Sequence, residues 1–409
     1  MNKFLKEFKD RGFFYQCTSE DELSKLLDNE KIKGYIGFDC TAESLHVGSL
    51  LQIMCLRLLQ KHGHRPIVLL GGGTTRIGDP SGKDKTRKIL SEENIEKNIE
   101  NIEKILKSFL DNKDKKTKPI FVNNYSWLKD LNYISFLRDI GKHFTINKML
   151  SFDSVKTRLE REQSLSYMEF NYMILQAYDF LELNKKENCI LQIGGSDQWG
   201  NIINGVDLIK RHSNKQAYGL TTPLITLASG AKMGKTESGA VWLDKKFLSP
   251  YEYWQFWRNI DDRDVLKFLK IFTDLSIEEI EEIKDQNINQ LKITLANKAT
   301  SMLHGVKEAK ICEETAKQTF SENKLGSGLP SISLNKKDLD NNLAIVDLII
   351  LSKLENSKSE IRRLIKGNGV KINNQVINDE KLLITKGLFE NSVIKLSLGK
   401  KRHIKVKLS

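Results

Sequence analysis

The stretch YIGFDCTAESLHVGSLL, residues 35–51, joins an apolar strand to an apolar helix through a polar turn. Residues 34–38 have the character of a short buried strand, and the leucine-rich residues 50–59 predict a helix that ends near Gly63. The turn therefore lies at the carboxyl end of a strand and the amino end of a helix. An open α/β sheet binds anions at that position, so the stretch predicts an α/β fold with its site at this turn.

The turn carries polar side chains together with a glycine that permits close approach. These residues are Asp39, Thr41, Glu43, Ser44, His46 and Gly48. Gly48 would let a nucleotide approach the backbone, and His46 could donate a hydrogen bond to a phosphate. A lone His-x-Gly spacing also fits a surface histidine before a buried helix, so the turn by itself does not establish catalysis.

Length and composition indicate a globular protein of two or three domains. The 409 residues are 39% hydrophobic and 29% charged, which argues against a disordered or membrane-embedded chain. No apolar run approaches the ~20 residues that span a bilayer. Residues 1–13 interleave lysine with acidic residues where a signal peptide would have an apolar core. We therefore expect a cytoplasmic protein without a membrane partner.

The cysteine and charge patterns narrow the kinds of partner. The five cysteines are widely spaced and form no Cys-x-x-Cys pair, so neither a disulfide framework nor a bound metal is predicted. The formal net charge of +12 favours an anionic partner. Residues 351–409 hold 14 Lys and Arg against 5 Asp and Glu, a local net charge of +9. A basic module after a nearly neutral body points to nucleic acid.

A second glycine-rich segment follows the first unit. The apolar run PIVLL, residues 66–70, predicts a parallel strand that completes a β-α-β unit. It leads into GGGTTRIGDPSGKDKTRK, residues 71–88, whose glycines and proline predict irregular structure. This segment is either a solvated loop or a second phosphate-handling loop beside the first.

Residues 167–183 predict a helix with three polar residues on one face. Tyr172, Gln176 and Asp179 follow the spacing i, i+4 and i+7 among Met, Phe, Ile and Leu. Buried polar groups need partners. These side chains either satisfy one another or bind a small polar ligand.

Two further segments bring polar residues to the ends of predicted strands. Residues 189–194 predict a parallel strand, with Gln192, Asp197 and Gln198 at its carboxyl end. Residues 224–227 are expected to form the last strand, leading into ASGAKMGKTESG, residues 228–239. That glycine-rich segment, with Lys232, Lys235 and Thr236, could close over a polyphosphate or could be a hydrophilic turn.

The remaining chain divides by composition. We expect a catalytic domain over residues 1–245 with a helical insertion at about 128–162, and a helical domain over 246–325. A linker follows at 326–340, where Gly, Ser, Asn and Pro cluster, and a small domain occupies 341–409.

In this order, the motifs HVGS, GDPSGK, YMILQAYD, DQWGN and KMGKT, followed by a basic tail, resemble those of the bacterial-type tyrosyl-tRNA synthetases, a class I aminoacyl-tRNA synthetase family. HVGS at 46–49 looks like the HIGH signature and KMGKT at 232–236 like KMSKS. The resemblance covers nearly the whole chain. It implies a doubly wound, Rossmann-like parallel sheet, then an α-helical domain, then a small α+β RNA-binding domain of the ribosomal-protein S4 type carried by residues 357–377.

The resemblance assigns roles residue by residue. Tyr35 and Asp179 would bind the phenol of L-tyrosine, and its ammonium would be held by Asp79, Tyr172 and Gln176. The adenosine ribose of ATP or the tyrosyl group would be bound by Asp39, Gln192, Asp197 and Gln198, and ATP would also meet Gly48 and Lys235. Catalytic contacts to the reacting phosphates or the departing pyrophosphate would come from Thr41, His46, Ser49, Lys83, Lys232, Lys235 and Thr236.

The implied reaction has two steps and no protein nucleophile. The tyrosine carboxylate attacks the α-phosphate of ATP, with Mg²⁺ accompanying the nucleotide, and the tyrosyl group then passes to the 3′ end of tRNA(Tyr). The tRNA phosphates would be contacted by Arg362, Arg363, Lys366, Lys371, Lys400, Lys401 and Arg402. Members of this family are homodimers.

Three positions depart from the family pattern: Cys40 replaces a frequent proline, Ser49 the second histidine of HIGH, and Gly234 the serine of KMSKS. The glycine is expected to loosen its loop. Competing interpretations are a tryptophanyl-tRNA synthetase, a small-molecule nucleotidyltransferase and a catalytically silent RNA-binding paralogue. Tyr35 with Asp179 argues against the first, the basic tail against the second, and His46 with Lys232 and Lys235 against the third.

Overall fold

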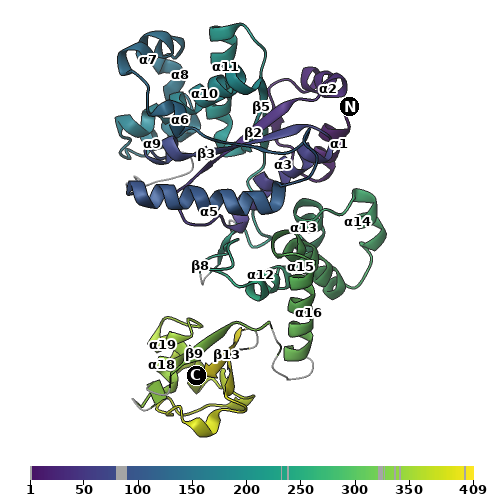
Figure 1. Cartoon of the computed structure of the whole chain (residues 1–409), viewed down its shortest axis with the longest axis vertical. Coiled ribbons are helices and arrows are strands. Elements are labelled where there is room, and N and C mark those ends of the chain that lie inside the picture. The colour runs from purple at the N-terminus through teal and green to yellow at the C-terminus, as the bar shows by residue number, and fades with distance from the viewer. Residues whose placement is uncertain are drawn as a thin grey trace. The chain divides into compact units, whose positions relative to one another are not determined.

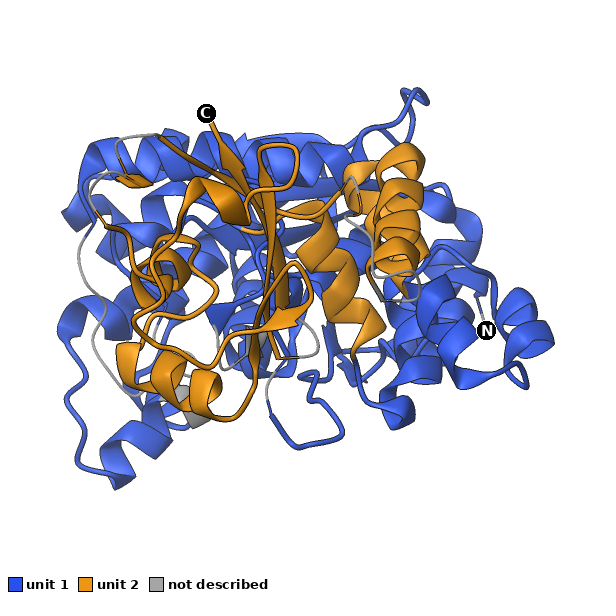
Figure 2. Cartoon of the chain, turned by 90° about the horizontal axis from the view of Figure 1, so that it is seen from below, with its two compact units in different colours: residues 1–247, 260–295 blue, residues 248–259, 296–409 orange. Residues whose placement is uncertain are grey.

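The computed structural model describes residues 2–79, 90–231, 233–236, 239–320, 326, 328–335, 338–339, 342–399 and 402–409. Lys83, Lys232, Lys400 and Lys401 lie outside these residues. The chain divides into two compact units, unit 1 with residues 1–247 and 260–295, and unit 2 with residues 248–259 and 296–409 (Figure 2). The expected boundaries near residues 245, 325 and 340 remain a prediction.

Unit 1 alternates strands with helices along most of its length (Figure 1). Its strands are β1 (Gln16–Cys17), β2 (Lys33–Asp39), β3 (Arg65–Gly71), β4 (Ile120–Asn123), β5 (Cys189–Gly195), β6 (Tyr218–Thr222), β7 (Lys235–Thr236) and β8 (Gly239–Ala240). Its α-helices are α1 (Lys3–Asp10), α2 (Glu20–Asn29), α3 (Leu50–Lys61), α4 (Gly72–Thr75), α5 (Glu92–Leu110), α6 (Tyr125–Leu128), α7 (Tyr133–Asp139), α8 (Ile146–Leu150), α9 (Asp153–Glu160), α10 (Tyr167–Glu187), α11 (Trp199–Ser213), α13 (Val265–Phe272) and α14 (Ile277–Ile283). The predicted insertion at about 128–162 contains α7, α8 and α9.

The described part of unit 1 forms a six-stranded sheet in the order β1-β6-β5-β2-β3-β4. All its neighbouring strands run parallel except β1, which pairs with β6 in the antiparallel sense. The chain progresses outward from β2 through β3 to β4, then returns to the other side of β2 as β5 and β6. The strand order therefore reverses between β2 and β5, and open α/β sheets bind ligands outside the carboxyl ends of strands at such a point.

Helices cover both faces of this sheet, as a doubly wound fold requires. On one face, Tyr35 and Ile67 share a buried cluster with Ala177 and Phe180 of α10. On the other face, Leu59 of α3 packs so closely on Gly34 that a Cβ there would lie 3.1 Å from its side chain. Successive residues of a strand point to opposite faces, so the alternation in β2 places one helical layer on each side.

Two predictions of local structure were wrong. The last parallel strand is β6, not residues 224–227, because Pro223 has no N–H for the sheet and Leu224 is exposed. Residues 72–75, expected to be irregular, form the short helix α4, whose four residues are all buried. The other predicted strands of the sheet and the helices over residues 50–59 and 167–183 are confirmed.

Unit 2 combines helices with a separate sheet. Its elements are α12 (Pro250–Arg258), the later residues of α15 (Ile288–His304), α16 (Val306–Phe320), β9 (Ser331–Leu334), α18 (Ile345–Leu351), α19 (Lys358–Lys366), β10 (Val370–Ile372), β11 (Gln375–Val376), β12 (Val393–Leu398) and β13 (Arg402–Leu408). The described strands have the order β11-β10-β12-β13-β9, and they enclose one apolar cluster with α18 and α19. Strand β9 lies within the segment expected to be a linker and pairs in parallel with β13.

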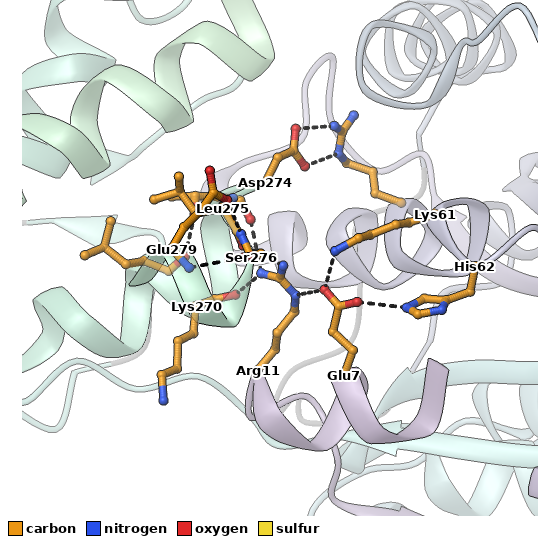
Figure 3. A network of polar contacts seen from close by, with 12 residues as sticks. Glu7, Arg11, Lys61, His62, Lys270, Asp274, Leu275, Ser276 and Glu279 are labelled. Atoms are coloured by element: carbon orange, nitrogen blue, oxygen red, sulfur yellow. Dashed lines mark hydrogen bonds and ion pairs between the residues drawn. The ribbon is translucent and has the colours of Figure 1, made fainter. Parts of the chain in front are cut away.

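A polar network ties the amino-terminal helix to the rest of unit 1 (Figure 3). The carboxylate of Glu7 accepts hydrogen bonds from Arg11, Lys61 and His62, at 2.7 to 2.8 Å. Arg11 is 4% exposed and also donates to the main-chain oxygen of Leu275, beyond α13.

Among the described residues no helix has the length and apolar character needed to cross a membrane.

Candidate active site

The two signature segments lie in contact at the amino end of α3. A Cβ atom on Gly48 would lie 2.5 Å from the His46 ring and 3.1 Å from the main-chain oxygen of Met233. Gly234 has φ of +93°, which disfavours other residues, and a Cβ there would lie 2.8 Å from Nδ1 of His46. The main-chain N–H of Val47 donates to the carbonyl of Val241 at 2.9 Å. The HVGS segment thus contacts Met233 and Gly234 of the KMGKT segment, with a glycine from each segment at the contact.

His46 is oriented by its own turn. Its Nδ1 accepts a hydrogen bond of 2.9 Å from the N–H of Gly48, so the ring is the N-cap of the short turn Val47–Ser49. Nδ1 therefore carries no proton, and Nε2 is the nitrogen that can donate. Ser49 makes no capping hydrogen bond with its side chain. Lys235 and Thr236 have their main chain in β7, paired with β8, and their side chains are not described.

Asp39, at the end of β2, accepts hydrogen bonds from two other elements. Tyr172 of α10 donates its hydroxyl to Oδ2 at 3.1 Å, and Thr74 of α4 donates to Oδ1 at 2.9 Å. Burial raises the pKa of Tyr172 well above its usual range, and the charges of Asp39, Asp79 and Asp179 raise it further. Three carboxylates therefore act on one buried phenol, which makes this part of the site suitable for a cationic ligand group.

Asp179 is a buried carboxylate held by two donors. Asn124 donates to Oδ2 at 2.9 Å and the indole N–H of Trp127 donates to Oδ1 at 2.8 Å. Burial raises the pKa of Asp179 to about 7, because it outweighs these two hydrogen bonds, and the charge of Asp39 adds to the effect. The sequence left open whether Tyr172, Gln176 and Asp179 bond to one another or bind a small polar ligand. Because the partners of Tyr172 and Asp179 come from other elements, these two side chains are not satisfied by their own helix face.

Two buried side-chain oxygens on neighbouring strands have no hydrogen-bond partner. They belong to the hydroxyl of Tyr35 and the side-chain carbonyl of Gln192. These residues are aligned in register on β2 and β5, so their side chains lie on the same face at the point where strand order reverses. The charge of Asp179 also raises the pKa of Tyr35, after the larger effect of burial. Orphaned buried polar atoms are costly unless a ligand completes them.

A second polar pair lies beyond the sheet edge. Gln198 donates its side-chain N–H to Oδ2 of Asp79 at 2.8 Å, and Asn201 donates to the Gln198 carbonyl at 3.1 Å. The structure thus joins two residues that the sequence separates by more than a hundred positions. Asp197 is exposed next to this pair, whereas Gln192, from the same predicted cluster, is buried in the sheet.

The remaining predicted residues differ in exposure. Thr41 and Gly48 are exposed, and His46, Ser49 and Gln176 are partly exposed. Exposure suits groups that would meet a ligand entering from solvent. Among the described residues no group of three or more His, Cys, Asp and Glu could hold a metal ion.

Sequence reasoning missed the supporting residues of the site. Asn124 bridges Thr74 and Asp179, and its Oδ1 accepts from the main-chain N–H of Gly73 at 2.7 Å. Asn124 directly follows β4, so its place at a strand's carboxyl end was a usable signal. Trp127 carried no such signal, because a tryptophan in a helix is usually interpreted as a core residue.

Comparisons with known proteins show the family to which the chain belongs. The family model described as tRNA synthetases class I (W and Y) matches residues 27–321. The chain belongs to the class I tRNA synthetases. A protein named tyrosine–tRNA ligase from Pelagibacter ubique (strain HTCC1062) is 83% identical to this class I synthetase over 408 residues, covering 100% of both chains. One of the same name from Wolbachia sp. subsp. Brugia malayi (strain TRS) is 55% identical, covering 100% of this chain and 99% of that protein.

A solved structure extends the comparison to three dimensions. The C-terminally truncated mitochondrial tyrosyl-tRNA synthetase of Aspergillus nidulans is 31% identical to this class I synthetase, with a TM-score of 0.71. The match covers 78% of this chain and 94% of the truncated enzyme. The predicted fold class is confirmed by this match together with the two sheets described above and a family match to the S4 domain at residues 346–388.

The carboxyl-terminal part of this class I synthetase matches the S4 domain at residues 346–388. Arg362, Lys366 and Lys371 are exposed there. Arg363 lies 2.7 Å from a carboxylate oxygen of Glu360, and Arg402 donates to the main-chain oxygen of Leu354 at 2.7 Å. The predicted cations of α19 and β10 thus face solvent. Arg363 and Arg402 also have partners in the protein, as does Arg362, which lies 3.7 Å from a carboxylate oxygen of Glu380.

Proposed function

We propose that this chain is a tyrosine–tRNA ligase that activates L-tyrosine with ATP and transfers the tyrosyl group to tRNA(Tyr). The observation that carries the proposal is the buried, partnerless hydroxyl of Tyr35 in the field of Asp179. The phenol oxygen of a tyrosine bound between them would accept a hydrogen bond from the Tyr35 hydroxyl, and its O–H would donate to the Asp179 carboxylate. The names of the relatives at 83% and 55% identity support the same activity.

The amino end of the substrate would lie toward the carboxylates around Tyr172. The charges of Asp39, Asp79 and Asp179 all act on that residue, so an ammonium group there would be stabilised. The resemblance leaves Gln192 to either the adenosine ribose or the tyrosyl group. Because Gln192 is aligned with Tyr35, we assign its free carbonyl to the tyrosine side of the site. Phenylalanine would be rejected because its ring would leave buried polar groups unpaired. Tyrosyl-tRNA synthetases are the known example of this effect, with ~10⁵-fold discrimination between tyrosine and phenylalanine.

ATP would bind across the contact between the two signature segments. His46 can donate from Nε2 to a phosphate oxygen, and Thr41, in the same turn of the chain, is exposed. The tyrosine carboxylate then attacks the α-phosphate and pyrophosphate leaves. Lys83, Lys232, Lys235 and Thr236 are proposed for the pyrophosphate. We propose that Mg²⁺ enters with the nucleotide, since this ion is commonly held through substrate phosphates.

The S4 domain would bind the tRNA. Lysine and arginine side chains on α19 and β10 can neutralise phosphates, so binding should weaken steeply with salt. Replacing Arg362, Lys366 and Lys371 together by Glu should leave adenylate formation unchanged and reduce aminoacylation at least tenfold. Lys104→Glu, at a solvent-exposed site on α5, is the matched control.

We further propose that two copies associate through the insertion at 128–162 and act in the cytoplasm. Its helices α7, α8 and α9 expose large apolar side chains, namely Tyr133, Ile134, Leu137, Ile146, Leu150 and Leu159. Exposed apolar groups in one segment are typical of protein interfaces. A homodimer in ultracentrifugation that dissociates with Ile134→Asp would support this surface, and a dimer that persists would exclude it.

Amino-acid-dependent exchange of labelled pyrophosphate into ATP tests the proposed activity. The assay is run with tyrosine, phenylalanine, tryptophan and no amino acid. Exchange with tyrosine alone is expected. Exchange with tryptophan would instead identify a tryptophanyl enzyme, and no exchange with any of them would favour the silent RNA-binding paralogue.

A further inference from the structure

Asn98 is a polar residue in the apolar face of α5. The other buried residues of this helix are Ile95, Ile99, Ile102, Ile105, Leu106, Phe109 and Leu110. Asn98 is 4% exposed, and its Nδ2 donates a hydrogen bond of 2.8 Å to the main-chain oxygen of Cys40. A buried amide in an apolar stripe is tolerated when it has a partner. The contact with Cys40 therefore explains why asparagine occupies this position.

Cys40 is held from its other side as well. Its main-chain N–H donates to Oγ1 of Thr75 at 2.8 Å, and Thr75 is 8% exposed on α4. Cys40 lies between Asp39, whose carboxylate is fixed by two donors, and the exposed Thr41. The peptide groups on both sides of Cys40 are thus bound to different helices.

We propose that Asn98 is a positioning residue for adenylate formation. It acts through the carbonyl of Cys40 to hold Thr41 in the orientation that the nucleotide requires. The inference rests on the proposed function, because it assumes that Thr41 meets ATP. A group misplaced by ~1 Å can slow a reaction ~10²-fold, so one lost contact behind the turn is enough to be measured.

The test compares two variants that lose the same kind of hydrogen bond. Asn98→Leu removes the donor to Cys40 and keeps an apolar side chain of similar size. Asn184→Leu is the matched control: Asn184 is 2% exposed on α10 and donates to the main-chain oxygen of Cys189 at 2.9 Å, at the start of β5. Rapid-quench measurements give the rate constant of adenylate formation, equilibrium dialysis gives the tyrosine dissociation constant, and thermal unfolding gives stability.

For Asn98→Leu we expect a ten- to hundredfold lower rate constant, with the tyrosine dissociation constant changed less than threefold. For Asn184→Leu we expect a lower unfolding temperature and a rate constant within threefold of wild type. Equal losses of rate in both variants, or an unchanged rate in Asn98→Leu, would overturn the proposal. Wild-type chain that forms no tyrosyl-adenylate would instead refute the proposed function, so the two failures are distinguishable.

Two further variants separate positioning from packing. Asn98→Asp places a carboxyl in the same apolar surroundings, which raise its pKa. Its protonated form can donate to Cys40 and its ionised form cannot, so the rate relative to wild type should rise severalfold from pH 8 to pH 6. A pH-independent ratio would contradict the proposal. If Asn98→Leu does not fold, Thr75→Val should slow the same step and Thr75→Ser should restore it; an unaffected Thr75→Val would likewise overturn the proposal.

Discussion

Gly234 lies directly against His46, and no side chain fits between them. A Cβ on Gly234 would be 2.8 Å from Nδ1 of the imidazole and 2.9 Å from the main-chain nitrogen of Gly48. The glycine also has φ of +93°, in the left-handed region. In this structure the glycine that replaces the serine of KMSKS therefore allows the two signature segments to lie in direct contact.

Gly234→Ala should reduce tyrosine-dependent pyrophosphate exchange at least tenfold. The new methyl group displaces the imidazole, whose Nδ1 is bound to Gly48, and so moves the donor proposed for phosphate. Gly230→Ala is the control, because Gly230 has φ of +83° and nothing within 4 Å of the added atom. It carries the cost of the left-handed backbone without the steric conflict. Equal losses in both variants would show that backbone strain alone is responsible.

Trp127→Phe should weaken tyrosine binding about tenfold at pH 7.5. The substitution removes one of the two donors to Asp179, and a hydrogen bond to a charged group contributes about 1.5–3 kcal/mol. Trp254→Phe is matched, since the Trp254 indole donates to Asn297 in unit 2 at the same distance of 2.8 Å. Equilibrium dialysis with labelled tyrosine measures both. A parallel change in the two variants would contradict a role for the Trp127 donor.

Tyrosine binding should strengthen as pH rises through about 7, the raised pKa of Asp179. The ionised carboxylate accepts a hydrogen bond from the substrate phenol, and its population grows up to tenfold per pH unit below the pKa. Dissociation constants from pH 5.5 to 8.5 test this expectation. In Asp179→Asn this pH dependence should disappear, and its persistence would assign the titration to another group.

The same pKa has a consequence for stability with a defined sign. The folded-state pKa of Asp179 is above the unfolded value of 3.8, so the folded state holds the proton more tightly. The contribution of Asp179 to the free energy of unfolding of the wild type is therefore largest below pH 3.8 and falls as pH rises to about 7. The unfolding free energy of Asp179→Asn relative to wild type should therefore increase over that range in urea titrations. A constant difference would contradict the raised pKa.

Glu7→Gln should destabilise unit 1 by about 1–2 kcal/mol at pH 7. Burial acts to raise the pKa of Glu7, but hydrogen bonds from Lys61, Arg11 and His62 outweigh it and lower the pKa to about 2 (Figure 3). A lowered carboxyl pKa contributes stability above pH 4.5 that is lost as pH falls toward 2. The difference between wild type and variant in urea unfolding should therefore shrink on acidification.

Glu187→Gln provides the comparison for Glu7. Glu187 pairs with Lys33 at 2.9 Å, and both side chains are about 30% exposed. An exposed pair contributes at most about 1 kcal/mol, so this variant should change the unfolding free energy less than Glu7→Gln does. The reverse order would mean that the Glu7 network adds no net stability.

The sequence by itself determined the elements that carry the site. Local hydrophobic periodicity decides whether a segment is a strand or a helix, and polar residues at the ends of parallel strands must meet at one sheet edge. That reasoning placed Asp39, Tyr172, Asp179 and Gln198 correctly on their elements. It failed at residues 224–227, an apolar run that looks like a strand but follows Pro223, which has no N–H to donate to the sheet. It also failed at residues 72–75, where burial stabilises a helix that the glycine composition disfavours.

Only the tertiary structure decided which partner each polar group has. Asn124 and Trp127 hold Asp179 across more than fifty residues, Asn98 reaches Cys40 from α5, and β9 joins β13 from the other end of its domain. Such contacts depend on how helices pack on the sheet, and packing is set by side chains that are distant along the chain. A local pattern can reveal that a buried amide or carboxylate needs a partner, but the fold selects it.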